Sequence, residues 1–567
     1  METTADFIIV GGGTSGLLLA SRLASTLSKP TIIVLEAGQD QNKSIYRNPY
    51  DRYALPFTAP ELDYGYQTVP QVGLANRMLP YARGKGLGGS SLINFMIYLS
   101  GAKGDYDQWA KLAGDETWKW ENVQRRLKEI ETFDRGVLSE VGHLAQPSSD
   151  SHGDSGPVSV GLPRKWEVGT KEIIEQVAAQ GIHINLDVNS GNPIGISMAP
   201  VSAKNGYRTT SASANLTTQR SNLQVWTNAT AKRVIFEGTH AVGVELVDGR
   251  KVFSKHETIL TAGSFASPQL LMLSGIGPRS ELSKLNIKAI KHLPGIGQNM
   301  NDHPVVFLTA LMKPEFSARM AFETSTSAVA SATKQWNEDG AGEFAHQMQS
   351  LGVMFNKLPS LSTTPEYQAL SPDQQLYLED ETIPTYECTF GGPKFPPSLQ
   401  IPSGFEYLGI SVFGMNPQGS GTLTLSSADI NDAPIIDPNL LTNPYDRLAI
   451  ISSIADSLRI FQATETYKQG FISWLSGPKS DSLVDIEAFV DGGAFPVWHA
   501  CGTAKMGKVE EEDEGVCVDG RFRVLGVEGL RVADMSVAPL VINGHTQAVA
   551  YLIGATAAEK LIEEYRL

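Results

Sequence analysis

Three glycines close to the N-terminus have the spacing that a phosphate-binding turn requires. Gly11, Gly13 and Gly16 form the pattern Gly-x-Gly-x-x-Gly, and Glu36 follows twenty residues after the last of them. In this pattern the first glycine permits a tight turn, the second lets the backbone approach a pyrophosphate, and the third lets a helix pack closely on a strand. A carboxylate placed like that of Glu36 can accept hydrogen bonds from ribose hydroxyls. These residues predict a site for the adenosine diphosphate half of NAD or FAD.

The elements that must position these residues are a strand, a helix and a second strand. Residues 7–10 form a short apolar run, which is typical of a buried parallel strand. Residues 17–27 have the composition of a helix, whose free N–H groups and positive dipole end would face the phosphates. Residues 31–35 predict a second buried strand, and Glu36 follows it directly. The glycine pattern therefore lies in the order of elements that binds a dinucleotide.

Composition indicates a large globular protein with more than one domain, because the chain has 567 residues. The net charge of −15 disfavours nucleic-acid binding, which needs a basic surface. Cys388, Cys501 and Cys517 are too few for a disulfide framework and lack metal-ligand spacing, so we expect buried thiols and no metal. No apolar run reaches 18 residues, so no membrane-spanning helix is expected. No secretory signal is visible, which predicts a cytoplasmic protein, although a secreted chain without its leader would look the same.

Two further stretches are rich in glycine and serine. Residues 84–107 read GKGLGGSSLINFMIYLSGAKGDYD, and residues 263–277 read GSFASPQLLMLSGIG. Together they resemble the two sequence signatures of the glucose–methanol–choline (GMC) oxidoreductases, which are FAD enzymes. Other landmarks of that family follow in order, including Gly295-Ile296-Gly297-Gln298-Asn299, Asp302-His303-Pro304, Trp498-His499, Asp534 and Gly544-His545-Thr546-Gln547. The resemblance covers nearly the whole chain, is weakest over residues 315–410, and includes fungal-type aryl-alcohol oxidases and dehydrogenases.

The resemblance implies an α/β fold: a doubly wound FAD-binding body with a discontinuous α+β cap that contains an antiparallel sheet. The cap would bind the substrate and decide its identity. We expect residues 1–155, 205–310 and 490–567 to form the FAD body, and residues 156–204 and 311–489 to form the cap. The expected FAD contacts are Gly11, Gly13, Thr14, Ser15, Gly16, Glu36, Ala37, Arg83, Gly84, Gly89, Ser90, Asn94, Val225, Asp534, Thr546 and Gln547.

Two histidines near the C-terminus are the predicted catalytic residues. An alcohol releases hydride from its carbon readily when a base removes the hydroxyl proton, and histidine titrates near working pH. His499 matches the active-site histidine of the family, so we assign it as the base. His545 matches a second position that holds histidine or asparagine, and we expect it to hydrogen-bond to the substrate oxygen. His303 lies in the Asp-His-Pro landmark, where a structural role is favoured over a catalytic one.

The residues expected around the substrate and the flavin are fewer. Trp498 is the first candidate for an aromatic contact to substrate, because an aromatic ring occurs there in relatives that act on aromatic alcohols. Met96, Tyr98 and Phe413 are further candidates. Some family members link FAD covalently through a histidine just before the position of Asn94. Ile93 stands at that position and cannot form the bond, so we expect FAD to be bound non-covalently.

The predicted function is oxidation of a primary or secondary alcohol, with aromatic alcohols and secondary metabolites among the expected substrates. Hydride would pass from the alcohol carbon to the flavin N5, and electrons would then pass to O2 or a quinone-like acceptor. The alternative is a lyase, isomerase or cyclase that uses the same scaffold without net redox change, because a histidine base serves those reactions too. The sequence leaves the substrate, the acceptor and the oligomeric state open.

Overall fold

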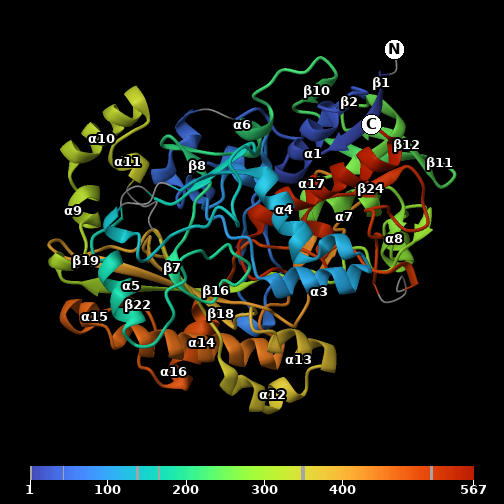
Figure 1. The fold of residues 1–567 in the computed structure, drawn as a ribbon. Coiled ribbons are helices and arrows are strands. Elements are labelled where there is room, and N and C mark those ends of the chain that lie inside the picture. Colours follow the sequence, from blue (N-terminus) through green and yellow to red (C-terminus); the bar gives the residue numbers. More distant parts are fainter. Residues whose placement is uncertain (1–2, 42–43, 136–138, 164–165, 347–350, 511–514) are drawn as a thin grey trace.

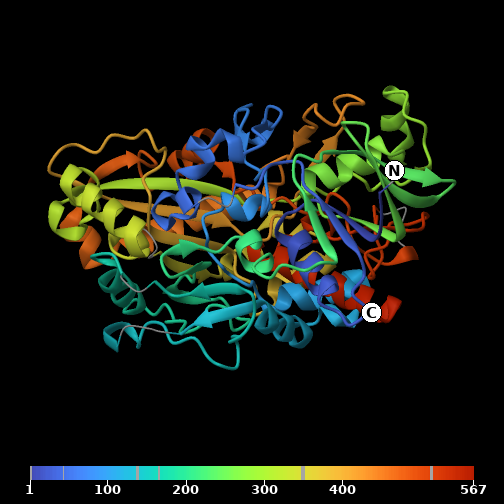
Figure 2. The ribbon, with the colours of Figure 1, turned by 90° about the horizontal axis from the view of Figure 1, so that it is seen from above.

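The computed structural model describes residues 3–41, 44–135, 139–163, 166–346, 351–510 and 515–567. Within these residues, two large sheets organise the chain into two bodies (Figure 1). The chain passes between the bodies several times, so each contains segments that are distant in sequence. Both views place the two chain ends on the body that holds the first sheet (Figure 2).

The first sheet is mainly parallel and has the strand order β10-β2-β1-β13-β12-β11, with β24 also paired to β13. The pairs among β10, β2, β1, β13 and β24 are parallel, while β11, β12 and β13 pair antiparallel at the edge. Residues 7–10 and 32–35 are buried throughout, as expected for central parallel strands. The strands are β1 (Thr3–Val10), β2 (Ile32–Leu35), β10 (Leu223–Trp226), β11 (Ala231–Glu237), β12 (His240–Leu246), β13 (Lys251–Leu260) and β24 (Leu530–Val532).

Two helices from opposite ends of the chain pack together in this body (Figure 1). They are α1 (Thr14–Ala24) and α17 (Thr546–Tyr565). The hydroxyl of Ser15 donates to the carbonyl of Ala550 at 2.7 Å, and a Cβ atom at Gly554 would lie 2.4 Å from the carbonyl oxygen of Ser15. The close approach therefore needs a glycine. Most of α17 is buried, which fits its apolar composition on all faces.

The second sheet is antiparallel and has the order β22-β16-β19-β18-β17-β7, with β23 paired to β16. Helix α14 (Pro444–Gln462) packs on β18 and β19 through a row of buried aliphatic side chains. This body is the antiparallel cap that the sequence predicts. Its strands are β7 (Gly195–Met198), β16 (Pro304–Met312), β17 (Gly352–Asn356), β18 (Tyr386–Gly392), β19 (Glu406–Gly414), β22 (Phe471–Ser476) and β23 (Phe495–Pro496).

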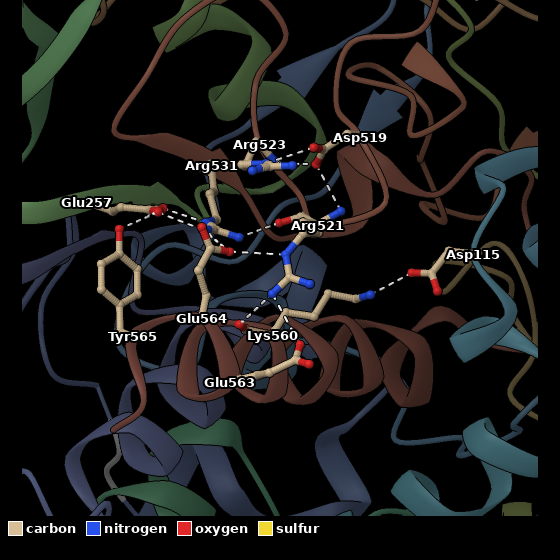
Figure 3. Close-up of polar contacts among 10 residues, drawn as sticks. All are labelled: Asp115, Glu257, Asp519, Arg521, Arg523, Arg531, Lys560, Glu563, Glu564 and Tyr565. Atoms are coloured by element: carbon tan, nitrogen blue, oxygen red, sulfur yellow. Dashed lines mark hydrogen bonds and ion pairs between the residues drawn. The ribbon is translucent and has the colours of Figure 1, made fainter. Parts of the chain in front are cut away.

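Charged side chains fix the C-terminal end of α17, as Figure 3 shows. Arg531 on β24 donates two hydrogen bonds to Glu257 on β13 and lies 3.0 Å from a carboxylate oxygen of Glu564. The hydroxyl of Tyr565 donates to the same Glu257 at 2.8 Å. Arg531 and Glu257 are both buried, so these contacts tie the end of the helix to the sheet.

The predicted fold class is confirmed, with local differences. The helix expected over 17–27 begins at Thr14 and ends at Ala24, because it starts at the glycine turn and Ser25 caps its end. Leu27 is left 98% exposed. The boundary expected between residues 310 and 311 falls inside β16, since the chain enters the cap sheet directly at Pro304. The remaining domain boundaries stay predictions. No helix within the described residues has the length and apolarity needed to cross a bilayer.

Candidate active site

A cavity with walls from both bodies brings most of the predicted site residues together. One wall comes from the glycine turn, the loop over residues 82–97 and the start of α17, and the opposite wall comes from β16, β18 and β19 of the cap. Six predicted residues do not line it: Gly11, Gly16, Glu36, Ala37, Tyr98 and Val225. The predicted residues that do line it are Gly13, Thr14, Ser15, Arg83, Gly84, Gly89, Ser90, Asn94, Met96, Phe413, Trp498, His499, Asp534, His545, Thr546 and Gln547.

The glycine turn joins β1 to α1 as the sequence predicts. Gly11 has a φ of +112°, and a Cβ atom there would lie 2.4 Å from the carbonyl oxygen of Thr261. A Cβ atom at Gly16 would lie 2.2 Å from the carbonyl oxygen of Gly11, so both positions require glycine for packing. A Cβ atom at Gly13 would meet no heavy atom closer than 3.9 Å. Gly13 therefore presents open backbone to the cavity at the N-terminus of α1, where free N–H groups favour an anion.

Glu36 lies directly after β2 and holds the backbone of the turn. Its Oε2 accepts from the N–H of Gly12 at 2.8 Å, and its Oε1 accepts from the N–H of Gly38 at 2.8 Å. Burial raises the pKa of the Glu36 carboxyl. Val225 on β10 pairs in register with Val34 on β2, so it lies beside the same strand. Contacts from Glu36, Ala37 and Val225 to an adenosine group stay predictions.

The two predicted catalytic histidines lie side by side, with ring centroids 4.9 Å apart. The backbone N–H of His499 donates to Asp302 Oδ1 at 2.8 Å, and its ring Nδ1 lies 3.1 Å from Nδ1 of His303. His545 is the residue just before α17, and its Nε2 lies 2.9 Å from Glu387 Oε1. These contacts leave Nε2 of His499 and Nδ1 of His545 for a molecule in the cavity. Two such imidazoles can exchange a proton with a hydroxyl group.

Two family models, both described as GMC oxidoreductase, match residues 5–305 and 417–554 of the chain. The chain belongs to the GMC oxidoreductase family. It is 31% identical to patulin synthase of Penicillium expansum, over 98% of this chain and 91% of that protein. It is 30% identical to alcohol dehydrogenase [acceptor] of Pseudomonas putida, over 99% of this chain and 96% of that protein. A solved FAD-dependent oxidoreductase from Chaetomium thermophilum superposes with a TM-score of 0.87 at 25% identity and covers 99% of this chain and 100% of its own.

GMC oxidoreductases bind FAD, and the residues around the cavity fit this cofactor. Gly13 and the N-terminus of α1 suit the pyrophosphate. Arg83 lines the cavity, and its buried Nε and Nη2 atoms have no hydrogen-bond partner among the described residues. The same holds for the buried Nε2 of Gln547 at the start of α17. These open donors, together with the positive end of α17, suit the electron-rich oxygens of FAD.

Asp534 and Asn94 also line the cavity, but the protein already engages their side-chain oxygens. Asp534 Oδ2 accepts from the N–H of Gly263 at 2.8 Å and from the hydroxyl of Ser267 at 2.5 Å. Asn94 Oδ1 accepts from Nη1 of the fully buried Arg208 at 2.6 Å. Both residues therefore hold the cavity wall in shape, and direct contacts from them to FAD stay predictions.

A bulge at Trp498 aims the segment that contains His499 in this GMC oxidoreductase. Asn301 and Cys501 exchange two backbone hydrogen bonds, at 3.1 and 3.0 Å, while Pro304 pairs with Pro496. The segment from Pro496 to Cys501 is therefore longer than the segment from Asn301 to Pro304 with which it pairs. Trp498 lies in the longer segment and has a φ of +68°. Such a bulge redirects side chains. Arg83 Nη1 supports it by donating to the carbonyl of Trp498 at 2.6 Å.

The prediction that Tyr98 lines the substrate cavity is wrong. Side chains alternate along the segment: Ile97 and Leu99 pack in the cluster that contains Phe413, whereas Tyr98 points into the core of the FAD body. Tyr98 is 1% exposed there, and burial raises its pKa well above the usual value. Met96, Phe413 and Trp498 do line the cavity. The three cysteines are buried thiols, as expected.

Two polar residues of the site differ from the prediction: Glu387 is not among the predicted residues, and His303 is predicted to have only a structural role. Glu387 lies on β18, inside the segment where the family resemblance is weakest, and the structure places it on His545. The available signal was a single acid within the apolar strand Tyr386–Gly392, because a buried carboxylate needs a partner. His303 was assigned a structural role, yet its ring contacts His499. Only tertiary pairing reveals that contact, since the two residues are far apart in sequence.

Proposed function

We propose that this enzyme oxidises an alcohol with His499 as the base that takes the hydroxyl proton. The observation that carries the proposal is the pair of buried imidazoles at the cavity wall, His499 and His545, whose ring centroids lie 4.9 Å apart. Burial, and then the neighbouring basic groups of His545, His303 and Arg83, hold the pKa of His499 well below its usual value. The ring is therefore unprotonated at neutral pH and can accept a proton.

The residues around His499 support this role. FAD bound in the cavity would supply the acceptor for the hydride that leaves the alcohol carbon. Nε2 of His499 takes the hydroxyl proton, and Nδ1 of His545 contacts the same oxygen and holds it between the two rings. Both rings are buried, which strengthens each polar contact in this exchange. The helix dipole of α17 places its positive end at the wall where negative charge develops.

The cavity wall on the cap side favours an apolar or aromatic alcohol. Phe307 on β16 and Phe413 on β19 line it, Phe95 and Trp498 line the cavity from the FAD body, and Tyr53 stands behind Phe95 with ring centroids 4.9 Å apart. Flat apolar rings bind aromatic groups well and offer no hydrogen-bond donor to an anionic substrate. Alcohols of secondary metabolism that carry such groups are within this class. O2 and a quinone-like compound are both candidate electron acceptors.

Anaerobic mixing of the FAD-loaded enzyme with a panel of aromatic and aliphatic alcohols tests the proposal. We expect the flavin absorbance to bleach with at least one aromatic alcohol. Turnover of a substrate with the flavin oxidised throughout, and with no acceptor consumed, would instead support a lyase, isomerase or cyclase.

Replacement of the base tests its role in the same experiment. In His499→Ala the bleaching rate should fall roughly a hundredfold to ten-thousandfold, which is the usual contribution of a general base. His143→Ala is the matched control, because His143 is exposed and outside the cavity. Bleaching of His499→Ala at a rate close to that of His143→Ala would show that another group is the base.

A further inference from the structure

The ring of His303 makes one hydrogen bond among the described residues, and this contact explains its place in the molecule. The residue immediately precedes β16, at the point where the chain leaves the FAD body for the cap. Its ring is 0% exposed, and its Nδ1 lies 3.1 Å from Nδ1 of His499. The ring centroids are 5.3 Å apart with the planes at 81°, so one ring meets the other edge-on. The other ring nitrogen of His303 has no hydrogen-bond partner among the described residues.

A contact between two ring nitrogens needs one donor and one acceptor. If His303 donated its proton, Nδ1 of His499 would be the acceptor, and the proton of His499 would sit on Nε2. That tautomer faces the cavity with an N–H group and cannot take a proton. If His499 donates from Nδ1, its Nε2 carries a lone pair toward the cavity. The direction of this one hydrogen bond therefore decides whether His499 is a base or an acid.

The surroundings of His303 leave its ring able to accept a hydrogen bond from His499. Burial, followed by the charge of His545, lowers the pKa of His303 to about 3, so the ring stays neutral and retains a lone pair. The neighbouring Asp302 holds the other side of His499 by accepting its backbone N–H at 2.8 Å. Asp302 is fixed in turn by the hydroxyl of Tyr81. The dipeptide Asp302-His303 thus contacts His499 at both its backbone and its ring.

We propose that His303 is a positioning residue that accepts the Nδ1–H of His499 and so fixes the base tautomer. This inference rests on the proposed role of His499 as the base. With FAD bound as the hydride acceptor, the hydroxyl proton would move to Nε2 of His499, and the alcohol, having also lost a hydride from its carbon, would become a carbonyl compound. The Nδ1–H stays on His499 and remains donated to His303. The neutral acceptor holds the ring as a carboxylate does in a catalytic triad, but without adding charge.

Two substitutions of His303 separate this role from packing. In His303→Asn the amide oxygen can occupy the place of Nδ1 and accept the same hydrogen bond, whereas His303→Leu fills space without an acceptor. We expect the limiting rate of anaerobic flavin reduction to fall about tenfold to a thousandfold in the leucine variant, because the wrong tautomer becomes available. The asparagine variant should stay within a few-fold of wild type. The dissociation constant of the alcohol should change little in either.

The controls distinguish the possible failures. Flavin absorbance and melting temperature confirm that each variant is folded and loaded with FAD. A slow His499→Ala with a His303→Leu at the wild-type rate would overturn the inference and leave the proposed function intact, whereas a fast His499→Ala would overturn both. Equal losses in the asparagine and leucine variants would show that His303 acts by packing. The double variant His303→Leu/His499→Ala should lose no more than His499→Ala alone.

A spectroscopic readout does not depend on activity. Nitrogen NMR of the FAD-loaded enzyme labelled with [15N]histidine distinguishes a ring nitrogen that carries a proton from one that carries a lone pair. The His499 signals, identified by their absence in His499→Ala, should report a protonated Nδ1 in wild type and in His303→Asn. In His303→Leu they should show a mixture of tautomers. A protonated Nε2 in the wild-type enzyme would overturn the inference.

Discussion

Glu387 on the cap strand β18 contacts His545 of the FAD body, with Oε1 of the acid 2.9 Å from Nε2 of the imidazole. The carboxylate is 0% exposed, and its other oxygen has no partner among the described residues. The contact joins the two bodies at the point where the substrate would bind. It also orients His545, because an acceptor at Nε2 leaves Nδ1 to face the cavity.

Replacement of Glu387 should slow flavin reduction. A hydrogen bond to a charged group contributes about 1.5–3 kcal/mol, so Glu387→Leu should lower the reduction rate about tenfold to a hundredfold. Glu387→Gln retains an acceptor oxygen and should lose less. Stopped-flow absorbance under anaerobic conditions measures both rates, and Glu406→Gln, on the neighbouring strand but outside the cavity lining, is the control. A glutamine variant slower than the leucine variant would contradict this role.

FAD should be released from the denatured protein. Ile93 occupies the position at which some relatives carry a histidine that bonds to the flavin, and its aliphatic side chain lines the cavity. Acid precipitation should therefore leave the yellow colour in the supernatant. Colour that stays in the washed pellet would show a covalent link through another residue.

Stability should fall as pH rises because of His152. This ring is 2% exposed, with Nδ1 2.7 Å from Glu131 Oε1 and Nε2 3.1 Å from Asp187 Oδ1. Burial lowers the pKa of His152, but the hydrogen bonds to Asp187 and Glu131 outweigh it and raise the pKa to about 9. The folded-state value lies above the usual 6.5, so the stabilisation is complete below about pH 6.5 and is lost as pH rises through 9. Its size is about 3 kcal/mol.

Melting temperatures at pH 6 and pH 9.5 test this pH dependence. Wild type should lose more stability over that interval than His152→Gln, which carries no ionisable ring. His143→Gln is the control, since His143 pairs with Glu175 on the surface and should behave like wild type. Parallel curves for wild type and His152→Gln would contradict the assignment.

Loss of the buried ion pair at the end of α17 should lower the stability of the protein far more than loss of the exposed ion pair nearby. Arg531→Met leaves Glu257 buried without its cation, which typically costs about 3–5 kcal/mol. Arg523 pairs with Asp519 nearby, but its side chain is 52% exposed, so Arg523→Met should cost no more than about 1 kcal/mol. Thermal unfolding of the two variants gives the comparison. Similar losses would show that burial of Glu257 is tolerated without Arg531.

Much of the FAD body was predictable because its residues act locally. The glycine turn and Glu36 need only a strand and a helix around them, and each lies where the pattern predicts. His499 and His545 were found through family landmarks, and the structure brings both to the cavity. The ends of α1 differed from prediction, because helix composition alone does not show where a turn begins.

The contacts between bodies were not predictable from the chain alone. Glu387, His303 and the misplaced Tyr98 all depend on which side of an extended segment faces the cavity. For Glu387 that choice is set by the register of the cap sheet, where a shift of one residue reverses it, and for the contact between His303 and His499 it is set by the bulge at Trp498. The register of a strand cannot be inferred from local composition.

Helix α17 is held at both ends, by the contact of His545 with Glu387 at its start and by the contacts of Glu564 and Tyr565 with the buried Arg531–Glu257 pair near its end. It covers about 30 Å between these points, at 1.5 Å per residue. One residue inserted within it would turn the two ends by about 100° relative to each other, and either the charges or the imidazole would lose its partner. The number of residues between the contacts at the two ends of α17 is therefore as restricted as the types of the residues that make them. Natural variants of this protein should change the composition of α17 freely on its few exposed positions and leave its length alone.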